Sequence, residues 1–218
     1  MTTLITRAAP DVWVATGQLG PWLRQAADPN DRAVAAALPR RRTAEFLAGR
    51  SLLRHLLRLT VPERASTPIR ADANGRPLLD GDPATGISIS HDGLAIAVAV
   101  GRGQRVGVDV QLPAPHVPDS LLHRCLGRHA QDVIPLSEHR RGVELAWVWT
   151  AQEACVKAAG TGLTGSPWSI DVPPGSREGQ WGGYRWISLR DRSHTPLSCA
   201  FSLSRFPSDA DGLEATCS

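Results

Sequence analysis

Hydrophobic residues recur at helical spacing in one long segment in the first third of the chain. Between Thr43 and Leu59 the apolar positions fall three and four residues apart, at Phe46, Leu47, Leu53, Leu56 and Leu57. Arginines occupy a neighbouring stripe, at Arg50, Arg54 and Arg58. The pattern predicts an amphipathic helix with a basic edge.

Apolar runs and alternation predict strands after this helix. Residues 87–90 and 94–100 are rich in Ile, Val and Ala, and the residues between them, His91-Asp92-Gly93, are typical of a hairpin turn. A further strand is expected at Val106-Gly107-Val108-Asp109-Val110, where the three valines share one face. Asp109 therefore faces away from that apolar row.

The remaining pattern continues the alternation of helices and strands. It predicts a turn at Asn74-Gly75, a Pro-rich loop at 113–118, helical material from about 120 to 159, and strands at 181–189 and 197–203. Residues 1–102 and 103–218 thus carry similar element orders. We expect an α+β fold built as a pseudo-twofold pair of similar subdomains, divided at this point, with the functional site at the seam.

Composition is that of a globular protein, with 218 residues, 42% hydrophobic and 21% charged. No stretch approaches the ~18 uninterrupted apolar residues of a membrane span, and the first residues lack the apolar region of a secretory signal. We therefore expect a cytoplasmic protein without a membrane partner. The four cysteines form no C-x-x-C pair, which predicts free thiols rather than disulfides or a zinc site.

The basic residues are almost all arginine. Of the 24 basic side chains 23 are Arg, and the single lysine is Lys157. A lysine can lose its proton near neutral pH in a suitable environment, whereas a guanidinium cannot. The formal charge of +3 is too small to indicate a nucleic-acid partner, and Arg40-Arg41-Arg42 is more typical of a solvated helix start.

Three short segments hold side chains that could carry chemistry, and each also has a structural explanation. His91 could simply end a hairpin. Glu153 and Lys157 are four residues apart, so they could form an exposed helical ion pair worth ~0.2–0.5 kcal/mol, and Thr150-x-x-Glu153 fits a capping box at a helix start. Asp109 is less easily explained, because a carboxylate inside a sheet needs a cation or several hydrogen bonds.

Taken together, the segments resemble the signature of the surfactin-type (type II) 4′-phosphopantetheinyl transferases. Gly107-Val108-Asp109 is followed, 44 residues after Asp109, by Glu153 within Trp149-Thr150-Ala151-Gln152-Glu153-Ala154-Cys155-Val156-Lys157. Further matches to the family pattern lie upstream in the same order, at Arg42, Glu45-Phe46, Gly49-Arg50, Gly75-Arg76-Pro77 and Ser88-Ile89-Ser90-His91.

The resemblance implies a transferase that moves the 4′-phosphopantetheine arm of coenzyme A to a serine of an acyl or peptidyl carrier protein. Adenosine 3′,5′-bisphosphate would be released. Mg²⁺ would be held by Asp109, Gln111 and Glu153. By the same resemblance the coenzyme A phosphates would be bound by Arg42, Arg50, Arg76, Ser90, His91 and Lys157. The proton of the attacking serine would go to Glu153 or Lys157, with a metal role preferred for Glu153 and a dual role for Lys157.

Two positions depart from the family pattern. Gln111 stands where many members have an acid, so its amide oxygen can ligate Mg²⁺ without adding negative charge. Gln152 stands where the motif usually has lysine, which would remove one phosphate contact. The alternative function is therefore a catalytically lapsed or repurposed member that binds coenzyme A or a carrier protein.

The basic edge of the first long helix offers a surface for a partner. Carrier domains are commonly acidic, so Arg54 and Arg58 are expected to contact the carrier through complementary charge. An internally duplicated chain can form its cleft without a second copy, so we expect a monomer.

Overall fold

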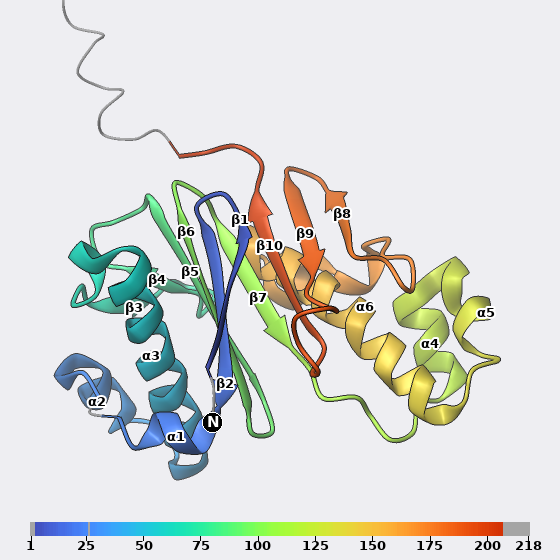
Figure 1. Cartoon of the computed structure of the whole chain (residues 1–218), viewed down its shortest axis with the longest axis horizontal. Coiled ribbons are helices and arrows are strands. Elements are labelled where there is room, and N and C mark those ends of the chain that lie inside the picture. The colour runs from blue at the N-terminus through green and yellow to red at the C-terminus, as the bar shows by residue number, and fades with distance from the viewer. Residues whose placement is uncertain (1–2, 26, 207–218) are drawn as a thin grey trace, which may run out of the picture.

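The computed structural model describes residues 3–25 and 27–206, and it contains two four-stranded antiparallel sheets and one short hairpin (Figure 1). The first sheet has the order β1-β2-β6-β5, with bounds β1 (Leu4–Ala9), β2 (Val12–Gln18), β5 (Thr85–Asp92) and β6 (Ala95–Arg102). The second has the order β7-β10-β9-β8, with bounds β7 (Val106–Val110), β8 (Glu178–Trp181), β9 (Tyr184–Ser188) and β10 (Leu197–Ser202). The hairpin pairs β3 (Ile69–Ala71) with β4 (Pro77–Leu79).

A long helix packs on each sheet, and shorter helices surround them. The long helices are α3 (Arg40–Thr60) and α6 (Glu138–Ala159), which lie on opposite sides of the paired sheets in Figure 1. The shorter helices are α1 (Leu19–Leu23), α2 (Pro29–Ala35), α4 (Asp119–Leu126) and α5 (Ala130–Val133), with single 3₁₀ turns at Pro62–Arg64, Gly127–His129, Gly162–Gly165 and Pro167–Ser169.

The same topology occurs twice along the chain. In the first half β2 is followed by α3 and then by β5 and β6, which line up as β2-β6-β5. In the second half β7 is followed by α6 and then by β9 and β10, which line up as β7-β10-β9. The predicted α+β fold with two similar subdomains is therefore confirmed, while the boundary between residues 102 and 103 stays a prediction.

Helix α3 forms where the apolar periodicity predicts it, but its arginine stripe is not an exposed edge. Leu53, Leu56 and Leu57 are fully buried against the first sheet. Arg54 is only 4% exposed, because its Nε lies 2.9 Å from the Asp31 carboxylate and its Nη1 donates to two backbone carbonyls. The expectation that Arg54 contacts a carrier is wrong, since α2 brings Asp31 over it, whereas Arg58 is exposed.

Helix α6 begins at Glu138, twelve residues before the motif threonine. Thr150 is therefore in the middle of the helix, where it is buried and its Oγ1 donates to the Trp147 carbonyl at 2.9 Å. The capping-box interpretation of Thr150 is wrong, because the helical segment continues upstream of it. Left-handed Gly160, at φ +77°, ends the helix.

The cysteines in the described residues are free, as predicted. Cys125, Cys155 and Cys199 are buried, and burial raises the pKa of Cys155 and of Cys199 to about 12. Such thiols are protonated at neutral pH and are poor nucleophiles. Cys217 lies outside the described residues.

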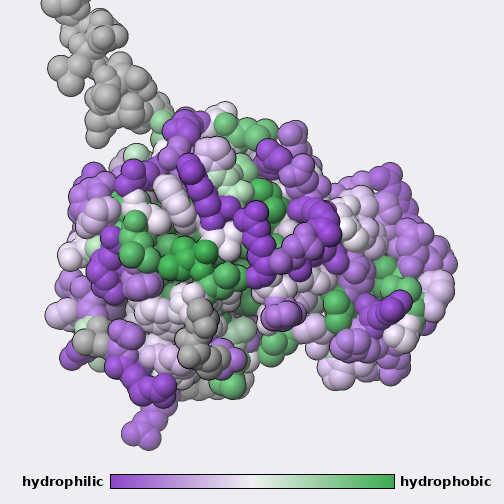
Figure 2. All heavy atoms as spheres, in the orientation of Figure 1, coloured by the Kyte–Doolittle hydropathy of each residue, from purple (hydrophilic) through white to green (hydrophobic). Residues whose placement is uncertain are grey.

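The molecular surface divides into regions of different polarity. On the face shown in Figure 2, hydrophobic residues gather left of the centre among the strands, whereas mostly hydrophilic side chains cover the part that holds α4 and α5.

Among the described residues, no helix is both long and apolar enough to span a bilayer.

Candidate active site

The two sheets meet at β5 and β7, which are the edge strands of their sheets. These strands are joined by serine side chains: Ser88 Oγ accepts a hydrogen bond from the Val108 N–H at 3.0 Å, and Ser90 Oγ accepts one from the Val110 N–H at 3.3 Å. Both serines are buried. The Ser-x-Ser of the family motif thus satisfies edge donors of β7 and holds the two halves together.

Replacing Ser88 with alanine is expected to lower the free energy of unfolding by about 1–3 kcal/mol, because the buried Val108 N–H loses its acceptor. Urea unfolding followed by circular dichroism measures this. Ser169→Ala is the matched control, since its hydroxyl only donates to a turn carbonyl, and it should change stability by less than about 0.5 kcal/mol. Equal effects of the two substitutions would contradict a role for Ser88 at the seam.

Gly107 lets α6 lie directly on β7. A Cβ at this position would come within 2.5 Å of the Ala158 backbone nitrogen and closer still to the Ala154 carbonyl oxygen. Only glycine permits this approach of backbone to backbone. The glycine of the Gly-hydrophobic-Asp motif therefore places the last turns of α6, with Glu153 and Lys157, against Asp109.

Asp109 and Lys157 form an ion pair at the centre of the seam. The Lys157 Nζ lies 2.6 Å from Asp109 Oδ1 and 3.1 Å from Ser90 Oγ, and the Ser90 hydroxyl donates to the same Asp109 oxygen at 2.7 Å. Asp109 is 5% exposed. The predicted orientation of Asp109, away from the valines of β7, is confirmed, because those valines pack in a separate core cluster.

Glu153 does not pair with Lys157 along the helix. Among the ion pairs of the described residues, Lys157 pairs across the seam with Asp109. The Glu153 Oε1 atom is buried and lacks a hydrogen-bond partner. Burial raises the pKa of the Glu153 carboxyl, nearby Lys157 opposes this shift, and Asp109 adds to it. An orphaned, half-buried carboxylate oxygen of this kind is a good acceptor for a metal ion or a proton.

One open, polar cavity of about 290 Å³ collects most of the predicted site residues. It is lined by Ile89, Ser90, His91, Asp92, Asp109, Val110, Gln111, Trp149, Glu153 and Lys157. The structure thus brings together, from β5, β7 and α6, all the residues predicted for catalysis and metal binding. This volume suits a diphosphate with a hydrated ion rather than a whole dinucleotide-sized ligand.

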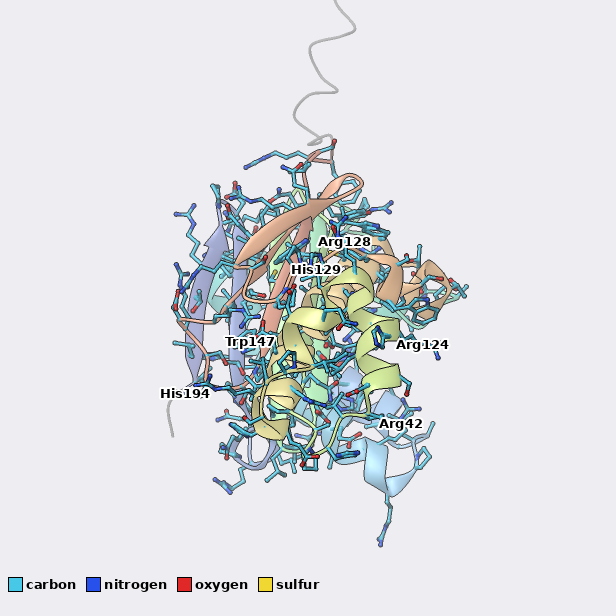
Figure 3. The ribbon with its side chains drawn as sticks, turned by 90° about the vertical axis from the view of Figure 1, so that its right-hand side faces the viewer. Arg42, Arg124, Arg128, His129, Trp147 and His194 are labelled. Carbon is cyan, nitrogen blue, oxygen red and sulfur yellow. The ribbon has the colours of Figure 1, made fainter. Side chains whose placement is uncertain are left out.

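Of the predicted phosphate-binding residues, three line this cavity, Ser90, His91 and Lys157, whereas Arg42, Arg50 and Arg76 are not part of its lining. His91 lines it and lies 3.9 Å from the Glu45 carboxylate of α3. Arg76 lies against the end of α6, where a Cβ on Gly160 would come within 3.1 Å of its Nη1, and its Nε is buried without a partner. Arg42 is exposed near the start of α3 (Figure 3).

Arg50 lies away from the cavity. It is 6% exposed, stacks on the Phe46 ring at 4.8 Å and approaches Asp31 at 3.9 Å. Its Nε and Nη1 atoms lack hydrogen-bond partners. A phosphate role for Arg50, as for Arg42 and Arg76, stays a prediction.

Gln152 does not face the cavity, although it precedes Glu153 in the motif. It is 1% exposed, and its Nε2 donates to the Cys125 and Ile170 carbonyls at 2.8 and 2.9 Å. These bonds fasten the end of α4 and the turn before residue 170 to α6. Gln152 therefore stabilises the second subdomain, a role that depends on partners 18 and 27 residues away along the chain.

Asp92 is a cavity residue that the sequence interpretation missed. Its Oδ2 accepts hydrogen bonds from Gln111 Nε2 at 2.7 Å and from the Leu112 N–H at 2.6 Å. It directly follows the motif histidine, and this adjacency was the one available signal. The bonds join the end of β5 to the end of β7.

The oxygen atoms at the cavity suit a divalent ion that is bound by the protein and by the substrate phosphates together. In residues 3–25 and 27–206, no cluster of three or more His, Cys, Asp and Glu side chains forms a metal site alone. Asp109, Gln111 and Glu153 nevertheless line one cavity, and the Oε1 atom of Glu153 has no hydrogen-bond partner. Mg²⁺ commonly takes one or two carboxylates and completes its shell with waters and substrate phosphates, so these oxygen donors fit it.

Comparison with known proteins covers most of the chain. The family model described as "4′-phosphopantetheinyl transferase N-terminal domain" matches residues 29–101, and that described as "4′-phosphopantetheinyl transferase superfamily" matches residues 105–206. A holo-(acyl-carrier-protein) synthase from Bacillus anthracis, solved in complex with CoA (3′,5′-ADP), is similar over 41% of this chain and 92% of its own, with a TM-score of 0.35 and 23% identity.

Curated relatives carry the same family name. The 4′-phosphopantetheinyl transferase AcpT of Escherichia coli O157:H7 is 32% identical over 147 residues, which cover 65% of this chain and 68% of that protein. The 4′-phosphopantetheinyl transferase pptA of Paxillus involutus is 32% identical over 145 residues, which cover 54% of this chain and about half (52%) of the relative. With these relatives and a site built from the family's own motif residues, the chain belongs to the 4′-phosphopantetheinyl transferase superfamily.

Proposed function

We propose that this chain transfers the 4′-phosphopantetheine arm of coenzyme A to a serine of an acyl or peptidyl carrier protein, with the reaction at the cavity between β5, β7 and α6. The observation that carries the proposal is the convergence of Asp109, Glu153 and Lys157 on that cavity. The three motif residues come from both sides of the β7–α6 contact. Their retention favours an active transferase over a protein that only binds coenzyme A.

Asp109 and Glu153 would hold Mg²⁺, with the Gln111 amide oxygen beside them. The ion would supply charge neutralisation for the diphosphate of coenzyme A and for the leaving bisphosphate. Lys157 would donate to oxygens of the same diphosphate, because its ammonium is held at the cavity by Asp109 and Ser90. His91, which lines the cavity, and Arg76 would contact further phosphate oxygens.

The serine proton has two candidate acceptors, Glu153 and Lys157. The Lys157 Nζ atom already contacts the Asp109 carboxylate, at 2.6 Å. Glu153 could bind the ion through one carboxylate oxygen and accept the proton on the other, and burial raises the pKa of its carboxyl. We assign proton acceptance to Glu153 and phosphate contact to Lys157.

Replacing Lys157 with arginine distinguishes these roles. Arginine keeps the charge but cannot act as a base, and its larger planar head fits less well beside Ser90. We expect kcat to fall by about tenfold with the pH profile of transfer unchanged in shape. A fall of roughly 10³-fold or more, together with a changed shape of the pH profile, would instead assign the proton to Lys157.

The function itself is tested by incubating the purified chain with coenzyme A, Mg²⁺ and an apo carrier protein. Mass spectrometry should show one added phosphopantetheine group on the carrier serine, with release of adenosine 3′,5′-bisphosphate. A Ser→Ala carrier is the control. Coenzyme A binding without any adduct on several acyl and peptidyl carriers would identify the chain as a binding protein instead.

A further inference from the structure

The cavity contains more negative charge than its motif residues supply. Its lining holds three carboxylates, Asp92, Asp109 and Glu153, against one lysine and the exposed His91. Lys157 is already paired with Asp109. When these carboxylates and the lysine are all ionised, the carboxylates exceed the lysine by two negative charges, three minus one, which matches the charge of one divalent cation.

Asp92 is a carboxylate of this lining that lacks a cationic partner. Among the ion pairs of residues 3–25 and 27–206 none includes Asp92, and its hydrogen bonds there come from Gln111 and Leu112 to the single atom Oδ2. A half-buried carboxylate without a cation is costly unless something compensates its charge. A cation bound in the cavity would provide that compensation.

The contact with Asp92 also decides which end of the Gln111 amide faces the cavity. An ionised carboxylate can only accept hydrogen bonds, so it must face the Gln111 amide nitrogen. The Gln111 Oε1 atom is therefore the end left for other partners. Gln111 lines the cavity beside Asp109, so this oxygen is available to an ion there.

We propose that Asp92 is a positioning residue for the divalent ion: it orients the Gln111 amide with its oxygen available to the ion and supplies the negative charge that residue 111 lacks. The effect acts through Gln111 and through the waters that Mg²⁺ retains, in the way that outer carboxylates tune metal ligands. The inference rests on the proposed function, because it concerns the same ion.

Variants at positions 92 and 111 test the contact between the Asp92 carboxylate and the Gln111 amide. Asp92→Asn keeps an oxygen for the Leu112 N–H and removes only the charge. Gln111→Glu alone places two carboxylates at a contact that is now 2.7 Å, so they repel each other. The double variant Asp92→Asn, Gln111→Glu restores one negative charge and removes the repulsion between two carboxylates.

The decisive experiment measures Mn²⁺ binding to the free chain by electron paramagnetic resonance, without coenzyme A. We expect Asp92→Asn to weaken Mn²⁺ binding by about tenfold, and the double variant to return to within about threefold of the wild type. Asp80→Asn, which removes a surface carboxylate paired with Arg70, is the control and should bind Mn²⁺ as the wild type does. Thermal unfolding verifies that each variant is folded.

Steady-state transfer gives a second readout. The Mg²⁺ concentration for half-maximal rate should rise by about tenfold in Asp92→Asn, while kcat at saturating Mg²⁺ falls by less than about threefold. Unchanged Mn²⁺ affinity in Asp92→Asn, or no rescue in the double variant, overturns the proposal. Absence of Mn²⁺ binding to the wild type also overturns it, whereas absence of carrier labelling with intact Mn²⁺ binding contradicts the proposed function alone.

Discussion

Replacing Glu153 with glutamine is expected to reduce phosphopantetheinyl transfer by roughly 10²- to 10⁴-fold, the range lost with a general acid or base. Glutamine has nearly the same shape, so the packing of α6 on β7 should remain. It can neither accept the serine proton nor contribute negative charge to the ion. Continuous assay of coenzyme A consumption, with mass spectrometry of the carrier at long times, measures the loss.

The same substitution should stabilise the fold at neutral pH. Burial raises the pKa of Glu153 in the folded chain above its ordinary value, so the folded state binds this proton more tightly than the unfolded state does. Above the ordinary pKa of 4.5 the carboxyl must be ionised at a cost in the folded chain. Glutamine lacks this cost, so the gain in stability should be present at neutral pH and absent once the pH falls below the ordinary glutamate pKa.

A matched control tests whether the effect on transfer is specific to the site or follows from the loss of any glutamate on α6. Glu138→Gln changes an exposed glutamate at the start of α6, which contacts His116, and it should leave transfer unchanged. Transfer by Glu153→Gln within tenfold of wild type would remove Glu153 from the chemistry.

The sequence predicted the elements whose signals are local. The apolar periodicity of residues 43–59 corresponds to α3, and the runs at 87–100 and 106–110 correspond to β5, β6 and β7. The strands β1 and β2 lie before the first element that the pattern predicts, and they were not predicted. Pro10 and Asp11 form the turn between these two strands, with Asp11 at φ +61°.

The sequence could not predict the side-chain roles that depend on partners distant along the chain. Arg54 looks like part of a basic surface stripe until α2 places Asp31 2.9 Å from it. Gln152 looks like a substituted phosphate contact until two distant carbonyls accept its amide protons. The role of Asp92 becomes visible only when β5 and β7 lie side by side, which brings Asp92 next to Gln111. Each of these partners lies at least eighteen residues away along the chain.

Replacing Gly107 with alanine is expected to abolish transfer and to lower the free energy of unfolding strongly. The new methyl group would overlap the Ala154 carbonyl and lie 2.5 Å from the Ala158 nitrogen, and both are backbone atoms of α6 that cannot rotate away. Either α6 shifts or the contact with β7 opens. We expect a loss of about 3 kcal/mol or more in the free energy of unfolding, the size associated with severe overpacking. Urea unfolding and the carrier-labelling assay measure the two effects.

Gly20→Ala is the control, because a Cβ there meets nothing within 4 Å and alanine favours helix α1 by about 0.5–1 kcal/mol. The informative case is a Gly107→Ala chain that still folds at low temperature. Since Asp109 sits on β7 and both Glu153 and Lys157 on α6, a displaced helix separates the groups that share the cavity, and carrier labelling should remain lost there. A folded variant that labels the carrier at the wild-type rate would show that the site tolerates a looser β7–α6 contact, and that Gly107 serves packing alone.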